Sequence, residues 1–171
     1  MHDATGRARG WSAALDAAAP GAANAAMPEP QPEPEFRNGA CHCGAVRFRV
    51  RLSEGLASAL RCNCSFCRMR GAVAVTARLG DLELLEGAGE LRLYQFHTMQ
   101  AEHHFCGRCG IYTHHRRRSN PDELGVNVAC LEGVSPFDFA RVRVLEGVVH
   151  PKDHPGGKQI AGYLHYEAKP E

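Results

Sequence analysis

The folded part of this chain is predicted to consist of short strands. From Phe36 onward, apolar and polar residues alternate in short runs divided by glycines, which is the pattern of half-buried strands. Residues 46–52 alternate almost perfectly, and similar strands are expected at 72–77, 91–96, 111–115, 126–128 and 140–145. Only residues 80–85 have the pattern of a helical turn. The sequence therefore predicts an all-β domain with many glycine turns.

The first 35 residues differ from the rest in composition. They are rich in Ala, Gly and Pro, and residues 28–34 carry a proline at every second position, as an extended linker does. We expect residues 1–35 to be disordered, residues 36–151 to form one zinc-binding domain, and residues 152–171 to be a C-terminal tail. Polar residues, Pro and Gly interrupt the run 13–26, so no secretory signal is predicted. Met27 offers an alternative translation start.

The charge balance argues against partners that are recognised by charge alone. Twenty Lys and Arg face nineteen Asp and Glu, which gives a formal charge of +1. Such a balance creates no strong attraction to nucleic acid or anionic lipid. The triplet Arg116 to Arg118 is a local exception, and we expect it to be a solvated loop. No stretch approaches the roughly 18 apolar residues of a membrane span, so neither a membrane nor nucleic acid is expected as a partner.

The cysteines carry the chemistry. Seven of the eight fall into three groups, which are Cys41 and Cys43, then Cys62, Cys64 and Cys67, then Cys106 and Cys109. These C-x-C and C-x-x-C spacings, with no secretory signal, favour reduced thiolates bound to metal in the cytoplasm over disulfides. Four thiolates close a structural zinc site, whereas three leave one position open for water or substrate, as catalytic zinc needs.

Spacing alone leaves the pairing of the groups open. In a strand, Cys41 and Cys43 point to one face and can share a metal with the knuckle that Cys106 and Cys109 form. The alternative is that Cys64 and Cys67 join the knuckle instead. The remaining cysteine, Cys130, lies in an apolar stretch and is expected to be a core thiol, although it could complete a second four-thiolate site.

Four segments taken together resemble a known family. They are Gly39-Ala40-Cys41-His42-Cys43-Gly44, Cys62-Asn63-Cys64-Ser65-x-Cys67, Phe105-Cys106-Gly107-x-Cys109-Gly110 and Gly125-Val126-Asn127-Val128-x-Cys130-Leu131. In this order they resemble the glutathione-dependent formaldehyde-activating enzyme family, which includes centromere protein V. The resemblance covers about residues 36 to 151. It implies a β-tent fold of several small sheets and two zinc ions. The implied structural zinc is held by Cys41, Cys43, Cys106 and Cys109, and the implied catalytic zinc by Cys62, Cys64 and Cys67.

The resemblance also implies a reaction. It is the addition of the glutathione thiol to formaldehyde, which gives S-(hydroxymethyl)glutathione and is formally a carbon–sulfur lyase reaction run in reverse. The expected partners are a small-molecule thiol and an aldehyde. No glutathione-binding segment can be carried over residue by residue, so another thiol or aldehyde stays open. Two alternatives also remain, namely a non-catalytic zinc module that binds protein or nucleic acid, and a thiol switch in the middle cysteine group.

Other polar residues are expected to have structural roles. His103 and His104 precede the knuckle, and in a strand one of them would face inward, but we expect packed or exposed side chains and not acid–base groups. We expect His114 and His115 to lie at an exposed strand end. Asn127 points opposite to its valine neighbours, which suggests the hypothesis of a substrate contact.

Overall fold

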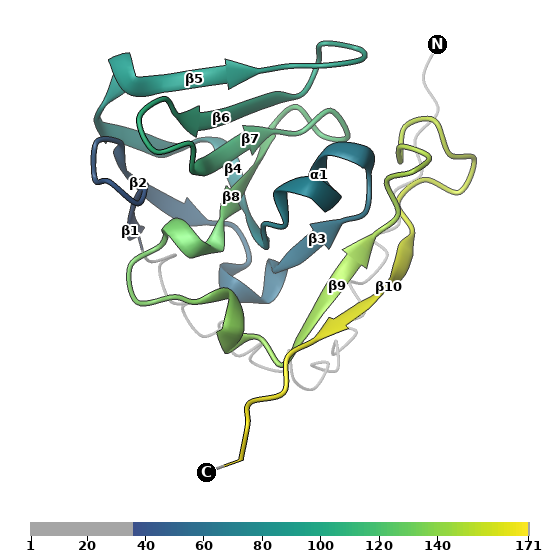
Figure 1. Cartoon of the computed structure of the whole chain (residues 1–171). Coiled ribbons are helices and arrows are strands. Elements are labelled where there is room, and N and C mark those ends of the chain that lie inside the picture. The colour runs from purple at the N-terminus through teal and green to yellow at the C-terminus, as the bar shows by residue number, and fades with distance from the viewer. Residues whose placement is uncertain (1–35, 171) are drawn as a thin grey trace, which may run out of the picture. The chain divides into compact units, whose positions relative to one another are not determined.

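The computed structural model describes residues 36–170, and Figure 1 shows its elements. The segment 1–35, which we expected to be disordered, lies outside the described residues. The described strands and the α-helix are β1 (Phe36–Ala40), β2 (Arg47–Leu52), β3 (Leu60–Cys62), α1 (Ser65–Arg70), β4 (Ala74–Glu86), β5 (Leu91–Tyr94), β6 (Glu102–Cys106), β7 (Tyr112–Arg116), β8 (Glu123–Asn127), β9 (Arg141–Leu145) and β10 (Ile160–His165). The prediction of an all-β domain is confirmed.

Strand β4 organises the sheet. It pairs with β2, β3 and β8, so the strands join into one branched sheet whose main path runs β10-β9-β3-β4-β8-β7-β6-β5. Among the described strands, β3 and β9 form a parallel pair and the other pairs are antiparallel. The β9–β10 hairpin therefore lies beside β3, and β5, β6 and β7 lie at the other end of the path (Figure 1).

The predicted alternation in β2 builds the main hydrophobic core. Phe48, Val50 and Leu52 are buried, while Arg47 and Arg49 between them are exposed. Valines from β4 and β8 pack against this face, because the same two-residue period places their side chains on the inner side of the sheet. Here the hydrophobic pattern predicted both the strand and its buried face.

The helical turn expected at 80–85 is wrong. These residues belong to β4, which continues to Glu86 along β2. The register shifts between the pairs Val50–Leu82 and Leu52–Ala77, so β4 carries extra residues as a bulge. Gly80 adopts a φ of +99° inside this bulge, a conformation that glycine accepts readily. The break in alternation that resembled a helix is the bulge.

Two elements near the second cysteine group were not anticipated. The six-residue helix α1 begins after Cys64, whose side chain accepts a hydrogen bond from the Cys67 N–H, and ends at Gly71 with a φ of +72°. Strand β10 pairs with β9, so part of the expected C-terminal tail joins the sheet. Among the described residues, no helix has the length and apolar character needed to span a membrane.

Candidate metal centres and cleft

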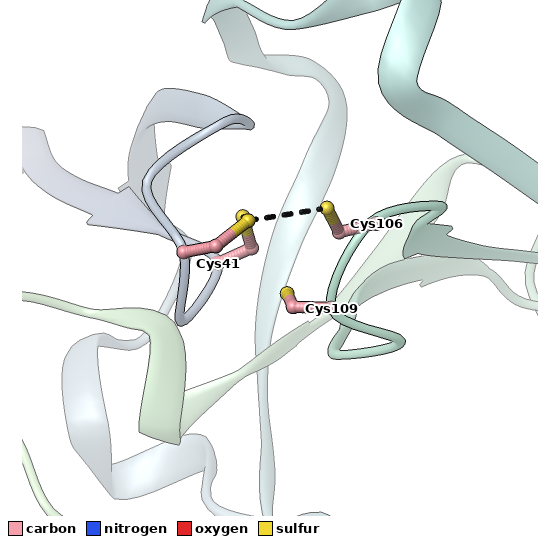
Figure 2. Close-up of side chains that lie close together, drawn as sticks. Cys41, Cys106 and Cys109 are labelled. Atoms are coloured by element: carbon pink, nitrogen blue, oxygen red, sulfur yellow. Dashed lines mark hydrogen bonds between the residues drawn. The ribbon is translucent and has the colours of Figure 1, made fainter.

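The first cysteine cluster consists of Cys41, Cys43, Cys106 and Cys109. Their sulfur atoms all lie within 4.8 Å of one another. The Sγ atoms of Cys41 and Cys43 are 3.6 Å apart, and those of Cys43 and Cys106 are 3.8 Å apart. Figure 2 shows the side chains of Cys41, Cys106 and Cys109 lying close together. A tetrahedral zinc with Zn–S bonds of about 2.3 Å requires sulfur atoms about 3.8 Å apart. The four side chains therefore fit a structural zinc.

Tight turns bring these four sulfurs together. The chain leaves β1 and turns at Gly44, which has a φ of +74°, and the Val46 N–H donates a hydrogen bond of 3.3 Å to the Cys41 sulfur. In the knuckle, Gly110 also has a φ of +74°, and its N–H donates to the Cys106 carbonyl over 2.8 Å. Glycine at these two positions permits turns that a side chain would strain.

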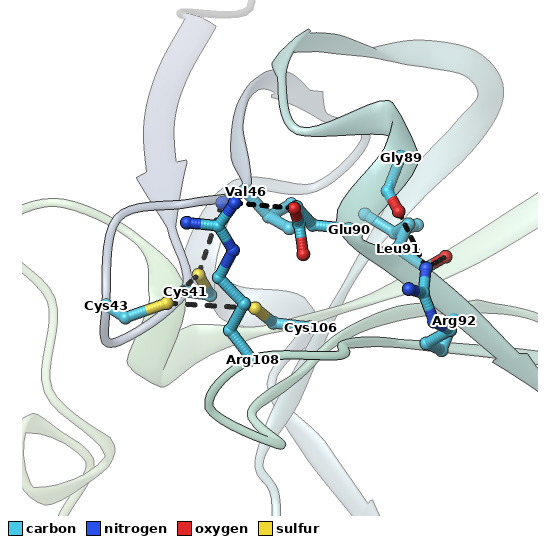
Figure 3. A network of polar contacts seen from close by, with 9 residues as sticks. All are labelled: Cys41, Cys43, Val46, Gly89, Glu90, Leu91, Arg92, Cys106 and Arg108. Carbon is cyan, nitrogen blue, oxygen red and sulfur yellow. Dashed lines mark hydrogen bonds and ion pairs between the residues drawn. The ribbon is translucent and has the colours of Figure 1, made fainter.

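Polar contacts tie the knuckle to the short 3₁₀ turn Ala88–Glu90 that precedes β5 (Figure 3). The Arg108 guanidinium lies 2.6 Å from the Glu90 carboxylate, and the Gly107 N–H donates to the Glu90 carbonyl over 2.7 Å. Exposed ion pairs stabilise proteins little, so the backbone hydrogen bond is the stronger constraint. Cys41 and Cys106 are buried, Cys109 is half-buried and Cys43 is exposed, so the first cluster lies at the surface with two of its four cysteines covered.

The second cysteine cluster consists of Cys62, Cys64 and Cys67. Cys62 ends β3, Cys64 caps α1 and Cys67 lies in the first turn of α1, and the three sulfurs lie within 4.8 Å of one another. The pKa of Cys64 lies far below that of a free thiol, because the thiols of Cys62 and Cys67 and the Cys67 N–H donate hydrogen bonds to its sulfur. Since this cluster supplies only three ligands, a tetrahedral metal bound there keeps one open position.

An open cavity of about 820 Å³ lies over the second cluster. Its volume is in the range of about 300–1,000 Å³ that is typical of small-molecule sites. Seven basic and three acidic side chains line it. In the described part of the chain, Arg61, Arg68, Lys152 and Lys158 form no ion pair with a carboxylate. The cavity, here called the cleft, is therefore electropositive.

The loop after β9 packs against the second cluster. The Asn63 side chain accepts a hydrogen bond of 2.7 Å from the Gly147 N–H and donates one of 3.2 Å to Glu146. A Cβ atom added at Gly147 would lie 2.4 Å from the Cys62 sulfur and 3.1 Å from Cys64 Cβ. Only glycine fits at this position without movement of the cysteine loop.

The arginine triplet is not the solvated loop we expected. Arg117 is only 9 % exposed and donates to Glu123 over 2.8 Å and to Thr76 over 2.9 Å. Arg118 makes two hydrogen bonds of 2.7 Å to Asp153 in the β9–β10 loop. Charge composition alone could not reveal these partners, because they are distant in sequence. Arg117 and Arg118 line the cleft, whereas Arg116 does not.

The histidines of β6 and β7 are packed and not exposed. Cross-strand pairing stacks His103 on His115 and His104 on His114. Burial and then the charge of Arg70 lower the pKa of His103 to about 4, and burial lowers the pKa of His114 to about 3. For His103 and His104 we expected packed or exposed side chains, and His103 is packed, whereas the expectation of an exposed strand end at His114 and His115 is wrong.

Asn127 and Cys130 both have structural positions. The Asn127 amide donates to the Tyr112 carbonyl over 2.8 Å and accepts from the Ala129 N–H, which caps the short 3₁₀ turn Val128–Cys130. Asn127 is buried and does not line the cleft, so the hypothesis of a substrate contact is wrong. Burial raises the pKa of Cys130 to about 12, in agreement with the prediction of a core thiol.

Sequence reasoning missed two residues beside the second cluster. Arg70 follows Cys67 by three positions, so on a helix both side chains share one face, and the missed α1 concealed this signal. The parallel pairing of β3 with β9 brings Gly147 to Cys62, and no local sequence pattern predicts such a contact.

The described domain is all-β and carries one four-cysteine cluster and one open three-cysteine cluster, and comparison with known proteins gives its family. The family model described as "Glutathione-dependent formaldehyde-activating enzyme" matches residues 36–141, which is more than half of the chain. The chain belongs to this family.

Two individual proteins are similar to this chain. A Halomonas elongata protein named "Putative glutathione-dependent formaldehyde-activating enzyme" is 42% identical over 80 residues, which cover 42% of this chain and 50% of the relative. The chain thus matches about half the length of this curated relative. A crystal structure of a Rhodobacter sphaeroides protein has 62% sequence identity and a TM-score of 0.62, and the match covers 63% of this chain and 98% of that chain.

Proposed function

We propose that this protein is a zinc-dependent carbon–sulfur lyase that forms or cleaves a thiol–aldehyde adduct such as S-(hydroxymethyl)glutathione. The observation that carries the proposal is the contrast between the two clusters. One closes with four sulfurs, whereas the other offers three sulfurs at the floor of an electropositive cleft. Membership of the formaldehyde-activating family supports the same reaction.

The proposal assigns a role to each cysteine. Cys41, Cys43, Cys106 and Cys109 hold a structural zinc within a domain of residues 36–151, and the Cys62, Cys64 and Cys67 cluster holds the reactive metal. Zinc bound there would act as a Lewis acid that holds the incoming thiol as a thiolate or polarises the aldehyde oxygen. In the adduct a bond joins the thiol sulfur to the carbonyl carbon, the C=O π bond is broken, and the thiol proton resides on the new hydroxyl.

The chain's own side chains orient the thiol substrate. Glutathione carries two carboxylates and one ammonium group, so a cleft with an excess of cations attracts it and can hold it by its carboxylates. Arg68 lies on α1 beside the cysteines, while Lys152 and Lys158 come from the β9–β10 loop on the opposite wall. Contacts from two walls fix the substrate sulfur above the cluster, and such positioning lowers the barrier to addition.

The alternative of a nucleic-acid-binding zinc module receives no comparable support. Phosphate binding through the arginine triplet requires free guanidinium groups. Arg116, Arg117 and Arg118 instead lie within ion-pair distance of Glu102, Glu123 and Asp153. We therefore propose small-molecule partners and a cytoplasmic location, where glutathione is abundant and thiolates stay reduced.

The test is exchange NMR of glutathione with formaldehyde. The zinc-loaded protein is compared with its Cys64→Ser variant and with a sample that contains no protein. Faster exchange between free and hydroxymethylated glutathione only with the intact cluster supports the proposal. Equal rates in all three samples, with two zinc ions measured per wild-type chain, would reject glutathione and formaldehyde as the substrate pair.

A further inference from the structure

Arg70 is a cation placed directly against the second cluster. It is the last residue of α1, and its Nη2 donates a hydrogen bond of 3.4 Å to the Cys67 sulfur. Its Nη1 lies 3.1 Å from His103 Nδ1. The guanidinium also lies 3.6 Å from the centroid of the Tyr112 ring and 5.2 Å from that of Phe66. Four neighbours therefore hold the guanidinium in one orientation.

No carboxylate neutralises this cation among the residues that the structure describes. Arg70 takes part in none of the described ion pairs, and its Nε is buried without a hydrogen-bond partner. The His103 ring beside it is neutral at pH 7, since its pKa is lowered to about 4. A cation that is taken out of water requires an anionic partner nearby. The three-sulfur cluster, which Arg70 contacts through the Cys67 sulfur, is the anionic partner that the geometry offers.

We propose that Arg70 is the counter-cation of the second cluster and that it lets the loaded cluster accept an anionic fourth ligand. This inference rests on the proposed function, because it concerns the binding of a thiolate substrate there. Three thiolates and one Zn²⁺ carry a net charge of −1, and a fourth thiolate raises this to −2. The positive charge of Arg70 offsets the second negative charge, whereas a neutral ligand such as imidazole gains little from it. Arg70 is thus a positioning and specificity-determining residue for thiols.

The experiment measures ligand binding and not turnover. The chain is loaded with Co²⁺, whose visible absorption reports a change of ligand, and is titrated with glutathione and separately with imidazole. Wild type is compared with Arg70→Gln, which removes the charge, and with Arg70→Lys, which keeps it. Arg78→Gln is the matched control, since it removes the charge of an exposed arginine that does not line the cleft.

The proposal predicts an ordered set of affinities. Hydrogen bonds to charged groups change equilibrium constants by about 10- to 150-fold. We therefore expect Arg70→Gln to weaken glutathione binding at least tenfold while imidazole binding changes less than threefold. Arg70→Lys should restore most of the glutathione affinity, and Arg78→Gln should leave the affinities for both ligands unchanged.

Three results would overturn the reasoning at different points. Equal losses of glutathione and imidazole affinity in Arg70→Gln would show a structural role only. Equal damage from Arg70→Lys and Arg70→Gln would show that the shape of the guanidinium matters and its charge does not. If the wild-type protein itself binds imidazole but not glutathione, the proposed function fails and not merely the role of Arg70. Circular dichroism of each variant, which must match wild type, excludes unfolding as the cause of any loss.

Discussion

Gly147→Ala tests whether the loop after β9 holds the second cluster in a metal-binding geometry. The added methyl group would lie 2.4 Å from the Cys62 sulfur, about 1 Å short of the 3.4 Å at which ordinary contact begins. The loop cannot simply retreat, because the Gly147 N–H is bonded to the Asn63 side chain over 2.7 Å. The φ of Gly147 lies outside the positive range, so the backbone itself tolerates alanine. The perturbation is therefore steric.

The expected magnitude follows from the size of the clash. Inserting one methyl group into a packed site usually costs about 1–3 kcal/mol. Metal–ligand distances are held to within roughly 0.2 Å, so a displaced Cys62 weakens binding directly. If the whole cost falls on the metal-bound state, zinc affinity at the second cluster decreases about 5- to 150-fold. The first cluster is built from other segments and should keep its zinc, and with it the fold.

The assay is a competitive zinc titration against a chromophoric chelator, with circular dichroism as a check on folding. Wild type should show two zinc equivalents of high affinity, and Gly147→Ala one of high affinity and one weakened. Gly162→Ala is the matched control, because a Cβ there has no atom within 4 Å and its φ is also ordinary. A folded Gly147→Ala protein with wild-type affinity at both clusters would refute the reasoning, as would an equal loss in Gly162→Ala.

Three further predictions concern the two clusters and the buried histidine. Cys106→Ser should unfold the domain, since structural zinc contributes folding free energy on the order of 10 kcal/mol, and a melting curve that overlays wild type would contradict this. Cys64→Ser should retain the fold and one zinc but lose thiol-dependent turnover, so an unfolded variant would disprove this separation of roles. Burial lowers the pKa of His114 to about 3, whereas the same side chain titrates near 6.5 in the unfolded chain. The free energy of unfolding is therefore highest above pH 6.5 and falls as the pH drops toward 3. At pH 5 this loss amounts to about 2 kcal/mol, and denaturant unfolding of His114→Gln should show a correspondingly smaller difference between pH 7 and pH 5.

The sequence predicted what local periods and ligand spacing determine. Phe48, Val50 and Leu52 follow a two-residue period and form the core face of β2. The cysteines were grouped by spacing, and the resemblance to a family supplied the pairing that the sulfur positions match. The two-residue period and the cysteine spacing are both local patterns, formed by residues a few positions apart.

The walls of the cleft could not be predicted in the same way. Arg118 meets Asp153 and Gly147 meets Cys62 only because the branched sheet brings distant segments side by side. The bulge of β4 around Gly80 breaks the alternation and imitates a helical period. Short local patterns carry no information about such long-range pairings.

The β9–β10 hairpin has a consequence for how this family can diversify. The match to the family model ends at residue 141, where β9 begins, and the loop of the hairpin contributes Lys152 and Lys158 to the cleft. All four cysteines of the first cluster lie earlier in the chain. The loop of this hairpin can therefore change in length or charge without disturbing that cluster. Under the proposed function, such a change would alter which thiol the cleft binds, provided that Gly147 stays over Cys62.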